Sequence, residues 1–248
     1  MKTLPTVQIP GINIRLARPT SSEIVNIAEL EKEVWGNNAA DADKILNRLN
    51  VFPDGSYVAE DGRTKKIVGY VCFQQVDDLR TQDSLNWSMI TDNGWTTGSH
   101  RVKGGYLYGI DMSVHYSMNG KKLGAALVSQ CFLYMIAERK AGIFTGSRIP
   151  MFKRYQKRCP KISAEEYMKL RRGEKFYDYE LNLYHQTGLA PINVKALPNF
   201  FPDEDSLNYG VLIFDDNPFR NYPAAEIDSL IELLINQDFI NLKKRAQK

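Results

Sequence analysis

The sequence predicts an α/β fold, in which helices flank a central mixed β-sheet. Residues 106–114 alternate between two kinds of side chain at a period of two, which is typical of a strand. After a short turn, residues 123–138 carry apolar side chains at helical spacing. Another strand pattern follows at 142–149. A strand, a helix and a second strand in this order predict a unit whose two strands run parallel or splay apart.

The patterns in this unit also predict which side chains share a face. The helix has one apolar stripe, formed by Leu123, Leu127, Cys131 and Tyr134. The first strand is expected to place its apolar side chains together, namely Tyr106, Tyr108, Ile110, Met112 and Val114. Asp111 and Ser113 then share the opposite face with His115.

Turn and cap residues delimit the elements before residue 77. Thr20 and Glu23 form a capping-box pattern, and Gly36 is a helix stop. The Asp-Gly pair of residues 61–64, DGRT, predicts a hairpin. The expected elements are a strand at 12–17, a helix from residue 20 to Gly36, a helix at about 39–50, and strands at 56–60 and 66–76.

The segment from residue 77 to 105 has no period of its own. It contains Trp87, Trp95 and His100. A long irregular connection in a compact domain is usually functional or disordered, and the two tryptophans argue against disorder. The aromatic side chains are expected either to wall a pocket or to fill the core.

After residue 150 the chain becomes basic and then alternates again between helices and strands. Residues 151–178 hold nine Lys or Arg against four acidic residues. Ser163 and Glu166 form a second capping box, and Gly173 is expected to stop that helix. The remaining elements are a helix from residue 179 to Gly188, strands at 191–197 and 208–214, and a last helix opened by Pro223. This helix carries a stripe of Ile227, Leu230, Ile231, Leu234 and Ile235.

Composition limits the classes of function. The chain has 248 residues, of which 43% are hydrophobic and 25% charged, as expected for a globular protein with a full core. A net charge of +3 gives no bulk argument for nucleic acid. The three cysteines and three histidines lack metal-ligand spacing, so no metal is expected, and free thiols suit the cytoplasm. The N-terminus has no apolar run for export or membrane insertion, so no membrane partner is expected.

The turn between strand and helix, residues 115–124, has the features of a phosphate site. It carries Gly120, Lys121, Lys122 and Gly124 immediately before the helix. This arrangement points backbone N–H groups and the positive end of a helix at one place, where an anion is stabilised. The alternative is an ordinary strand-to-helix turn.

These elements and motifs resemble the GNAT family of acyl-CoA N-acyltransferases. The family signature is Gln or Arg, two variable residues, Gly, one variable residue, and Gly or Ala, and residues 119–124 are similar to it. Asn119 and Lys122 depart from the signature, whereas Gly124 matches it. The stretch LYHQTGL, with Tyr184 four residues before Gly188, looks like another family motif. LYGIDMSVH, GSRIPMFKRY and LPNFFPDED are similar to the GNAT domain that accompanies carbon–nitrogen hydrolases, and the resemblance covers residues 12–216.

The resemblance implies a sheet splayed between its fourth and fifth strands, with acetyl-CoA bound in the opening. It implies an N-acetyltransferase that acts on a primary amine of a small molecule or peptide by direct attack in a ternary complex. Residues 1–220 would form the GNAT-like domain. Residues 221–248 would form a C-terminal amphipathic helix, packed on the domain or used to form a homodimer. The cofactor-binding residues would be Met112, Ser113, Val114, Asn119, Gly120, Lys121, Lys122, Leu123, Gly124 and Ala125.

The chemistry of such an enzyme selects two catalytic candidates. An amine must be neutral to attack, so a base is expected, and Asp111 is the candidate, with a structural hydrogen bond as its alternative role. Tyr184 is the candidate acid for the departing thiolate, with simple packing as its alternative. Trp87, Trp95 and His100 are the candidates for substrate binding.

Three alternatives remain at the level of the sequence. The enzyme can transfer a longer acyl group, which the depth of the pocket near Tyr184 and Cys72 would decide. The chain can be a catalytically weak acyl-CoA-binding or protein-interaction module on the same fold. The basic run can contact the 3′-phosphate of the cofactor or an acidic acceptor, or form a solvated face. No RNA-binding motif accompanies it, so nucleic acid is not expected as a partner.

Overall fold

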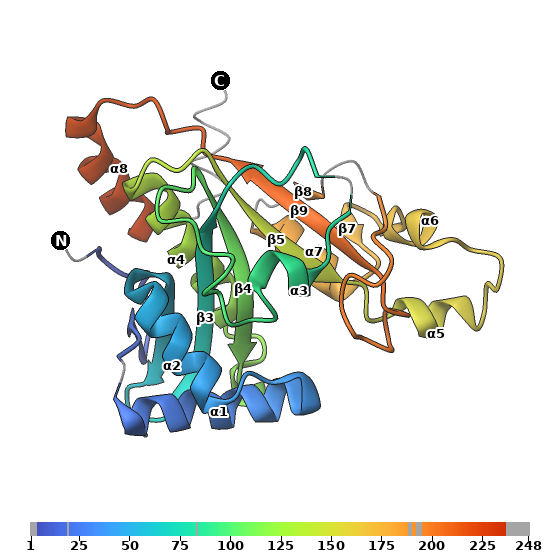
Figure 1. Ribbon diagram of the computed structural model, residues 1–248, viewed down its shortest axis with the longest axis horizontal. Helices are drawn as coiled ribbons and strands as arrows, with labels where there is room; N and C mark the ends of the chain where they lie inside the picture. Colours follow the sequence, from blue (N-terminus) through green and yellow to red (C-terminus); the bar gives the residue numbers. More distant parts are fainter. Residues whose placement is uncertain (1–3, 19, 83, 188–189, 192–194, 237–248) are drawn as a thin grey trace.

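A computed structural model describes residues 4–18, 20–82, 84–187, 190–191 and 195–236 (Figure 1). A seven-stranded sheet forms its centre, with strand order β1-β2-β3-β4-β5-β9-β8. Strands β4 and β5 run parallel, and the other neighbouring strands run antiparallel. The predicted mixed sheet is thus confirmed. Its strands are β1 (Ile12–Leu16), β2 (Ser56–Asp61), β3 (Ile67–Val76), β4 (Tyr106–Val114), β5 (Gly142–Arg148), β8 (Ala190–Pro191) and β9 (Gly210–Asp216).

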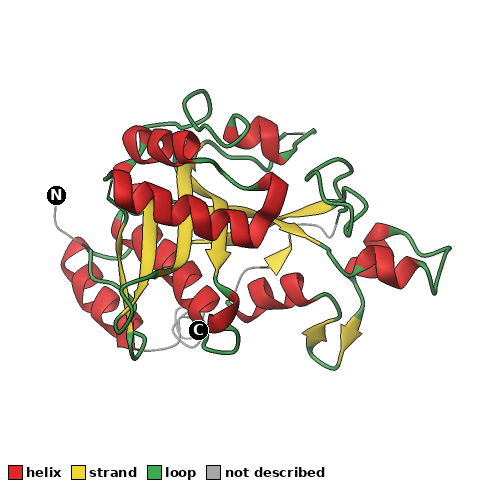
Figure 2. Cartoon of the chain, turned by 90° about the horizontal axis from the view of Figure 1, so that it is seen from below, coloured by secondary structure: helices red, strands yellow, loops and turns green. Residues whose placement is uncertain are grey.

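Helices cover both faces of this sheet (Figure 2). Helices α1 (Ser21–Trp35) and α2 (Ala42–Val51) pack on one face, and α4 (Leu123–Ala137) and α8 (Ala224–Asn236) share the core of the other. The stripe predicted for α4 is buried there. The remaining helical elements are α3 (Trp87–Thr91), α5 (Phe152–Gln156), α6 (Ala164–Met168), α7 (Tyr179–Gln186), and the 3-10 turns η1 (Gly36–Asn38), η2 (Pro53–Gly55) and η3 (Tyr116–Met118).

The start of α1 differs from the predicted capping box. The helix begins after Thr20, but the Thr20 side chain makes no capping hydrogen bond. The Glu23 carboxylate instead accepts from the Arg18 backbone N–H at 2.6 Å and from the Arg15 guanidinium at 2.9 Å. The cationic Arg15 on neighbouring β1 binds this carboxylate more strongly than a neutral backbone N–H does. The helix ends at Gly36 as expected, with φ of 58°.

A bulge in β4 overturns the prediction that its apolar residues share one face. Cys72 pairs with Asp111 and Phe73 with Gly109, so Ile110 is the extra residue. The extra residue shifts the alternation by one position. Tyr106, Tyr108 and Ile110 therefore pack toward α1 and α2, whereas Met112 and Val114 pack toward α4.

Strands β4 and β5 pair over only part of their length. The pairs run from Tyr106 with Gly142 to Gly109 with Thr145. Beyond these pairs β4 continues to Val114 and β5 to Arg148. The two strands therefore part after Gly109, as the predicted splay requires. We call this opening the splay.

The segment between β5 and α7 confirms one local prediction and corrects another. The capping box of Ser163 and Glu166 is formed at the start of α6. Gly173 does not stop that helix, which ends at Met168. With φ of 62° it lies between β6 (Arg171–Arg172) and β7 (Lys175–Phe176). A hairpin turn needs the same positive φ as a helix stop, so the glycine alone does not distinguish the two.

Two predictions lie partly outside the described residues. The α7 helix ends at Gln186, and Gly188, expected to end it, is not described. The strand expected at 191–197 includes residues 192–194, which are also not described, and Leu197 forms an isolated bridge with Gly210. No helix in the described part of the chain is long and apolar enough to span a membrane.

Helix α8 packs against α4. Ile227, Leu230 and Ile231 are buried in the core that contains the α4 stripe, whereas Leu233 is 47% exposed. The described apolar stripe of α8 thus lies inside the molecule.

We predict that Ile231→Ala lowers the free energy of unfolding by about 2–4 kcal/mol, because it removes buried methyl groups and leaves a cavity. Leu233→Ala, on the exposed face of the same helix, should change the free energy of unfolding by about 0.5 kcal/mol or less. Urea unfolding of both variants tests this. Equal effects of the two substitutions would contradict the packing of α8 on α4.

Candidate functional site

The splay exposes an edge of β4 that has no strand partner in the described structure beyond Gly109. Residues 111–114 still pair with β3 on their other side, so their backbone is held extended. An extended edge of this kind can hydrogen-bond with an elongated ligand as another strand would. Met112, Ser113 and Val114, the predicted backbone contacts, lie along this edge.

The turn predicted to hold phosphate lies between the end of β4 and α4. Residues 119–122 are exposed, and the first bond of the helix runs from the Ala126 N–H to the Lys122 carbonyl at 3.1 Å. The N–H groups before Ala126 have no partner within a helix that begins at Leu123. The predicted contacts at Leu123, Gly124 and Ala125 are these first helical residues.

Lys122 keeps the backbone shape that the family signature assigns to glycine. Its φ is 59° and its ψ is 16°, which is the left-handed region, and Gly120 has φ of 77°. For a residue with a Cβ this region costs about 1–2 kcal/mol. The lysine therefore preserves the glycine-like turn at the expense of strain, and adds an exposed charge beside the N-terminus of α4.

Asp111 faces α2 and is held by a buried arginine. Arg48 donates from Nη1 to the Asp111 carboxylate at 3.1 Å and from Nε to the Gly94 carbonyl at 2.8 Å. The Arg48 side chain is only 2% exposed and that of Asp111 10%. The predicted structural bond of Asp111 is therefore an ion pair with a helix, and not a bond within the sheet.

Glu31 of α1 lies beside Asp111, and sequence reasoning missed its role. Ser113 Oγ donates to Glu31 Oε1 at 2.5 Å, and Trp35 Nε1 donates to Ser113 Oγ at 2.8 Å. Glu31 is fully buried. Its position on the apolar stripe of α1, four residues after Ile27, was the available signal, because an acid among core positions needs a partner.

The surroundings of Glu31 favour its protonated form. Burial raises the pKa of Glu31, and the neighbouring Asp111 carboxyl raises it further, whereas Ser113 and Arg48 lower it less. Two carboxyl groups in contact cannot both ionise at low cost, so one shared proton is the stable arrangement. The Ser113 side chain is committed to this network, which leaves only its backbone for the splay.

Tyr184 lies on the other side of the sheet, in the core with α4. It is half-buried and lies near the side chain of Thr145, which is paired with Gly109 at the point where the strands part. Burial, with a contribution from Glu180, raises the pKa of Tyr184, so the hydroxyl keeps its proton. The bulge places Asp111 on the opposite face, and the structure does not bring these two predicted catalytic side chains into contact.

A wall of the splay forms where β5 ends. The Arg148 guanidinium lies 4.5 Å from the centre of the Trp35 ring and binds Glu180 at 2.9 Å and Asp203 at 3.6 Å. These contacts join α1, β5 and the start of α7. No sequence pattern had singled out Trp35 or Arg148.

The three residues predicted to bind substrate lie in three places. Trp87 donates to the Ile110 carbonyl at 3.0 Å and so contacts the bulge of β4. Trp95 is 38% exposed and lies by Lys44, on the outer side of α2. His100 accepts from the Gln75 N–H and packs on Phe52, near the other end of β4. Burial and nearby cations lower the pKa of His100. Of the three, only Trp87 lies beside the candidate site.

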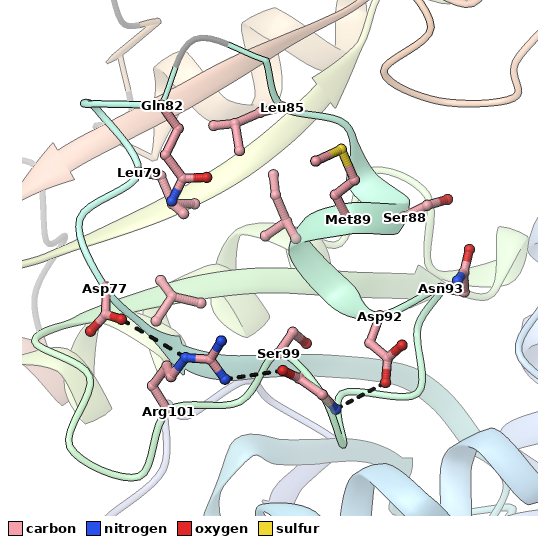
Figure 3. Close-up of a pocket in the computed structure, with 13 residues that line it drawn as sticks. Asp77, Leu79, Gln82, Leu85, Ser88, Met89, Asp92, Asn93, Ser99 and Arg101 are labelled. Atoms are coloured by element: carbon pink, nitrogen blue, oxygen red, sulfur yellow. Dashed lines mark hydrogen bonds and ion pairs between the residues drawn. The ribbon is translucent and has the colours of Figure 1, made fainter.

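The same loop also encloses a cavity of about 460 Å³. Figure 3 shows Leu79, Leu85 and Met89 along its upper side and Asp77, Asp92 and Arg101 along its lower side. None of the predicted site residues lines this cavity. The described residues contain no group of three or more His, Cys, Asp or Glu arranged to hold a metal ion.

No protein-family model matches the chain. The chain is 31% identical over 181 residues to an uncharacterized N-acetyltransferase of Bacillus subtilis, YkwB, and the match covers 71% of the chain and 75% of that relative. It is 27% identical over 199 residues to a probable hydrolase of the same species, YhcX. That match covers 77% of the chain but only 36% of the hydrolase.

Two solved structures have the same fold. The loading GNATL domain of CurA from Lyngbya majuscula has a TM-score of 0.70 at 20% identity, and covers 83% of the chain and 97% of that domain. The GNAT-like decarboxylase GphF, in complex with isobutyryl-CoA, has a TM-score of 0.67 at 22% identity, with 82% and 98% covered. At these identities the likeness concerns the fold alone.

We predict that Glu31→Gln removes a pH dependence of stability. The unfolded chain releases the Glu31 proton near pH 4.5, whereas the folded chain holds it to higher pH. Folding therefore loses stability as pH rises through this window, by at most about 1.4 kcal/mol per pH unit for one proton. Glu31→Gln has a neutral side chain at every pH, so it should not show this loss. The free energy of unfolding of the variant should therefore rise relative to that of the parent from pH 5 to 8.

Urea unfolding at several pH values measures both slopes. Glu29→Gln, an exposed change on the same helix, is the matched control and should keep the slope of the parent. Parallel profiles for the parent and Glu31→Gln would mean that Glu31 is ionised in the fold.

We also predict that Lys122→Gly raises the free energy of unfolding by about 0.5–1 kcal/mol, because relief of left-handed strain exceeds the added entropy of the unfolded chain. Lys121→Gly, at a neighbouring residue whose φ is not positive, should lower it. Thermal unfolding compares the two, and a loss of stability in both variants would contradict the strain at Lys122.

Proposed function

Since this chain belongs to the GNAT family of acyl-CoA N-acyltransferases, we propose that it transfers an acetyl group from acetyl-CoA to a primary amine of a small molecule or peptide. The observation that carries the proposal is the splay, with the unpaired edge of β4 leading into the exposed turn before α4 and the N-terminus of that helix. The described free cysteines, Cys72, Cys131 and Cys159, suit a cytoplasmic protein.

In this proposal the acyl donor binds along the splay. The backbone of residues 112–114 pairs with its extended arm, and residues 119–125 bind its pyrophosphate through N–H groups and the dipole of α4. Lys122 adds a positive charge at this end. The left-handed backbone of Lys122 supports this role, since it keeps the turn open in the way that a glycine does.

Asp111 is the proposed base. The attacking amine must lose a proton, and Asp111 accepts it directly or through a water molecule while Arg48 holds the carboxylate in place. Glu31 is a positioning residue, because it contacts Asp111 and Ser113 and does not reach the reacting atoms. Backbone N–H groups near Met112 would stabilise the negative charge that develops on the carbonyl oxygen.

Tyr184 is the proposed acid. When the tetrahedral intermediate collapses, the carbon–sulfur bond breaks and the thiolate takes the hydroxyl proton of Tyr184. The raised pKa of Tyr184 supports an acid over a base, since the group is protonated at neutral pH. The tyrosine regains a proton from solvent, and the products are an amide and free coenzyme A.

One observation favours the alternative of an acyl-CoA-binding module with weak turnover. Asp111 is already bound in an ion pair by the buried Arg48, so its carboxylate is committed to a structural contact. Binding and turnover therefore need separate measurements.

We predict that the protein binds acetyl-CoA, and calorimetry with the purified chain tests this first. Lys122→Ala should weaken binding by about threefold to tenfold through loss of one exposed charge, whereas Tyr184→Phe should bind as the parent does. A parent that binds neither acetyl-CoA nor coenzyme A would contradict the proposed function.

For turnover, release of free thiol is followed with acetyl-CoA or isobutyryl-CoA and a panel of primary amines. Tyr184→Phe should lower the rate constant kcat by about a hundredfold or more. Tyr179→Phe, an exposed change on the same helix, is the control. Tight binding without turnover of any amine would favour the binding module.

A further inference from the structure

The basic segment between β5 and α7 forms a lobe that projects from the sheet (Figures 1 and 2). Helices α5 and α6 and the β6–β7 hairpin make up this lobe. It encloses a cavity of about 230 Å³, lined by Met151, Arg154, Tyr155, Arg158, Arg172 and Tyr177. None of these residues belongs to the splay or to the turn before α4.

Ring contacts and hydrogen bonds hold the aromatic wall of this cavity in place. The Tyr155 and Tyr177 rings meet edge to face at 5.0 Å, and both contact the ring of Tyr167. The buried Asp178 carboxylate accepts from the Tyr167 hydroxyl at 2.9 Å and from the Met151 N–H at 3.1 Å. These bonds join the start of α5 to the segment after the hairpin.

The three arginines of the lining have no acidic partner among the described residues. Four acids around the lobe are bound elsewhere: Asp178 as above, Glu166 by the N–H of Ser163, Glu180 by Arg148, and Glu204 by Lys153. Glu174 is exposed in the hairpin and Glu165 is half-buried on α6, and neither forms an ion pair with the three arginines. Arg172 instead lies over the Tyr177 ring, at 4.3 Å from its centre. Three unpaired guanidinium groups around one cavity repel one another, and an anion between them would remove that repulsion.

We propose that this cavity binds a phosphomonoester that carries a planar ring. A phosphomonoester bears about −1.5 to −2 charges at pH 7, which matches three guanidinium groups better than a single carboxylate does. Arginine forks bind phosphate oxygens in pairs, and tyrosine faces and edges accept an aromatic ring. The cavity has the volume of about eight water molecules, enough for such a group but not for a whole coenzyme A.

Calorimetric titration with phenyl phosphate tests the proposal. The parent should bind phenyl phosphate, and the affinity of the double variant Arg158→Gln/Arg172→Gln should be lower by about tenfold or more. Lys157→Gln/Lys161→Gln removes the same charge from the same segment outside the lining, and should bind within about twofold of the parent. Phenyl sulfate, a monoanion of similar shape, should bind the parent about tenfold more weakly.

Three results would overturn the proposal: no binding of phenyl phosphate by the parent, equal weakening in the two double variants, or a matching loss of acetyl-CoA affinity in Arg158→Gln/Arg172→Gln. The last would assign the cavity to the acyl-CoA site. Adenosine 5′-monophosphate and phosphotyrosine amide then distinguish a nucleotide from a phosphorylated peptide. The probe that resembles the natural ligand should bind more tightly than the other. All substituted residues are exposed, and an unchanged unfolding temperature verifies the fold of each variant.

Discussion

A single buried guanidinium joins three segments that are distant in sequence. Arg48 of α2 binds the carbonyl of Gly94 in the long loop and the carboxylate of Asp111 on β4. With Arg48 in place, Asp111 is held against Glu31, and Glu31 against Ser113. Removing either partner of a buried ion pair leaves an uncompensated charge, which costs about 3–5 kcal/mol. The arrangement of Asp111, Glu31 and Ser113 beside the splay depends on this ion pair.

The bulge in β4 explains why that ion pair can form. The extra residue Ile110 places its own side chain and that of Asp111 toward α1 and α2. Without the extra residue, the alternation of Tyr106 and Tyr108 would continue through Met112, and Asp111 would face α4. The parting from β5 begins one residue before the bulge. One irregularity in one strand thus directs a carboxylate to the other face of the sheet, at the position where the pairing with β5 has ended.

Local signals predicted much of the fold. The Asp-Gly hairpin, the α4 stripe and the capping box of α6 each depend on residues within a few positions of one another, and each is present. The β4 pattern predicted a strand but not its bulge, because a two-residue period reads the same on either side of an inserted residue. Glu23 was misassigned because its partner, Arg15, belongs to another element. For the same reason Arg48, Trp35 and Arg148 gave no signal, whereas Glu31 gave one as an acid on an apolar stripe.

Three hydrogen bonds join the long loop that carries Trp87 to elements of the core. Gln74 donates to the Ile90 carbonyl, Arg48 to that of Gly94, and Trp87 itself to that of Ile110. Moving the loop away from the core would remove hydrogen bonds from a buried amide and a buried guanidinium at the same time. The loop is therefore held against the core as a fixed part of the fold, and is not a lid that opens with each catalytic cycle.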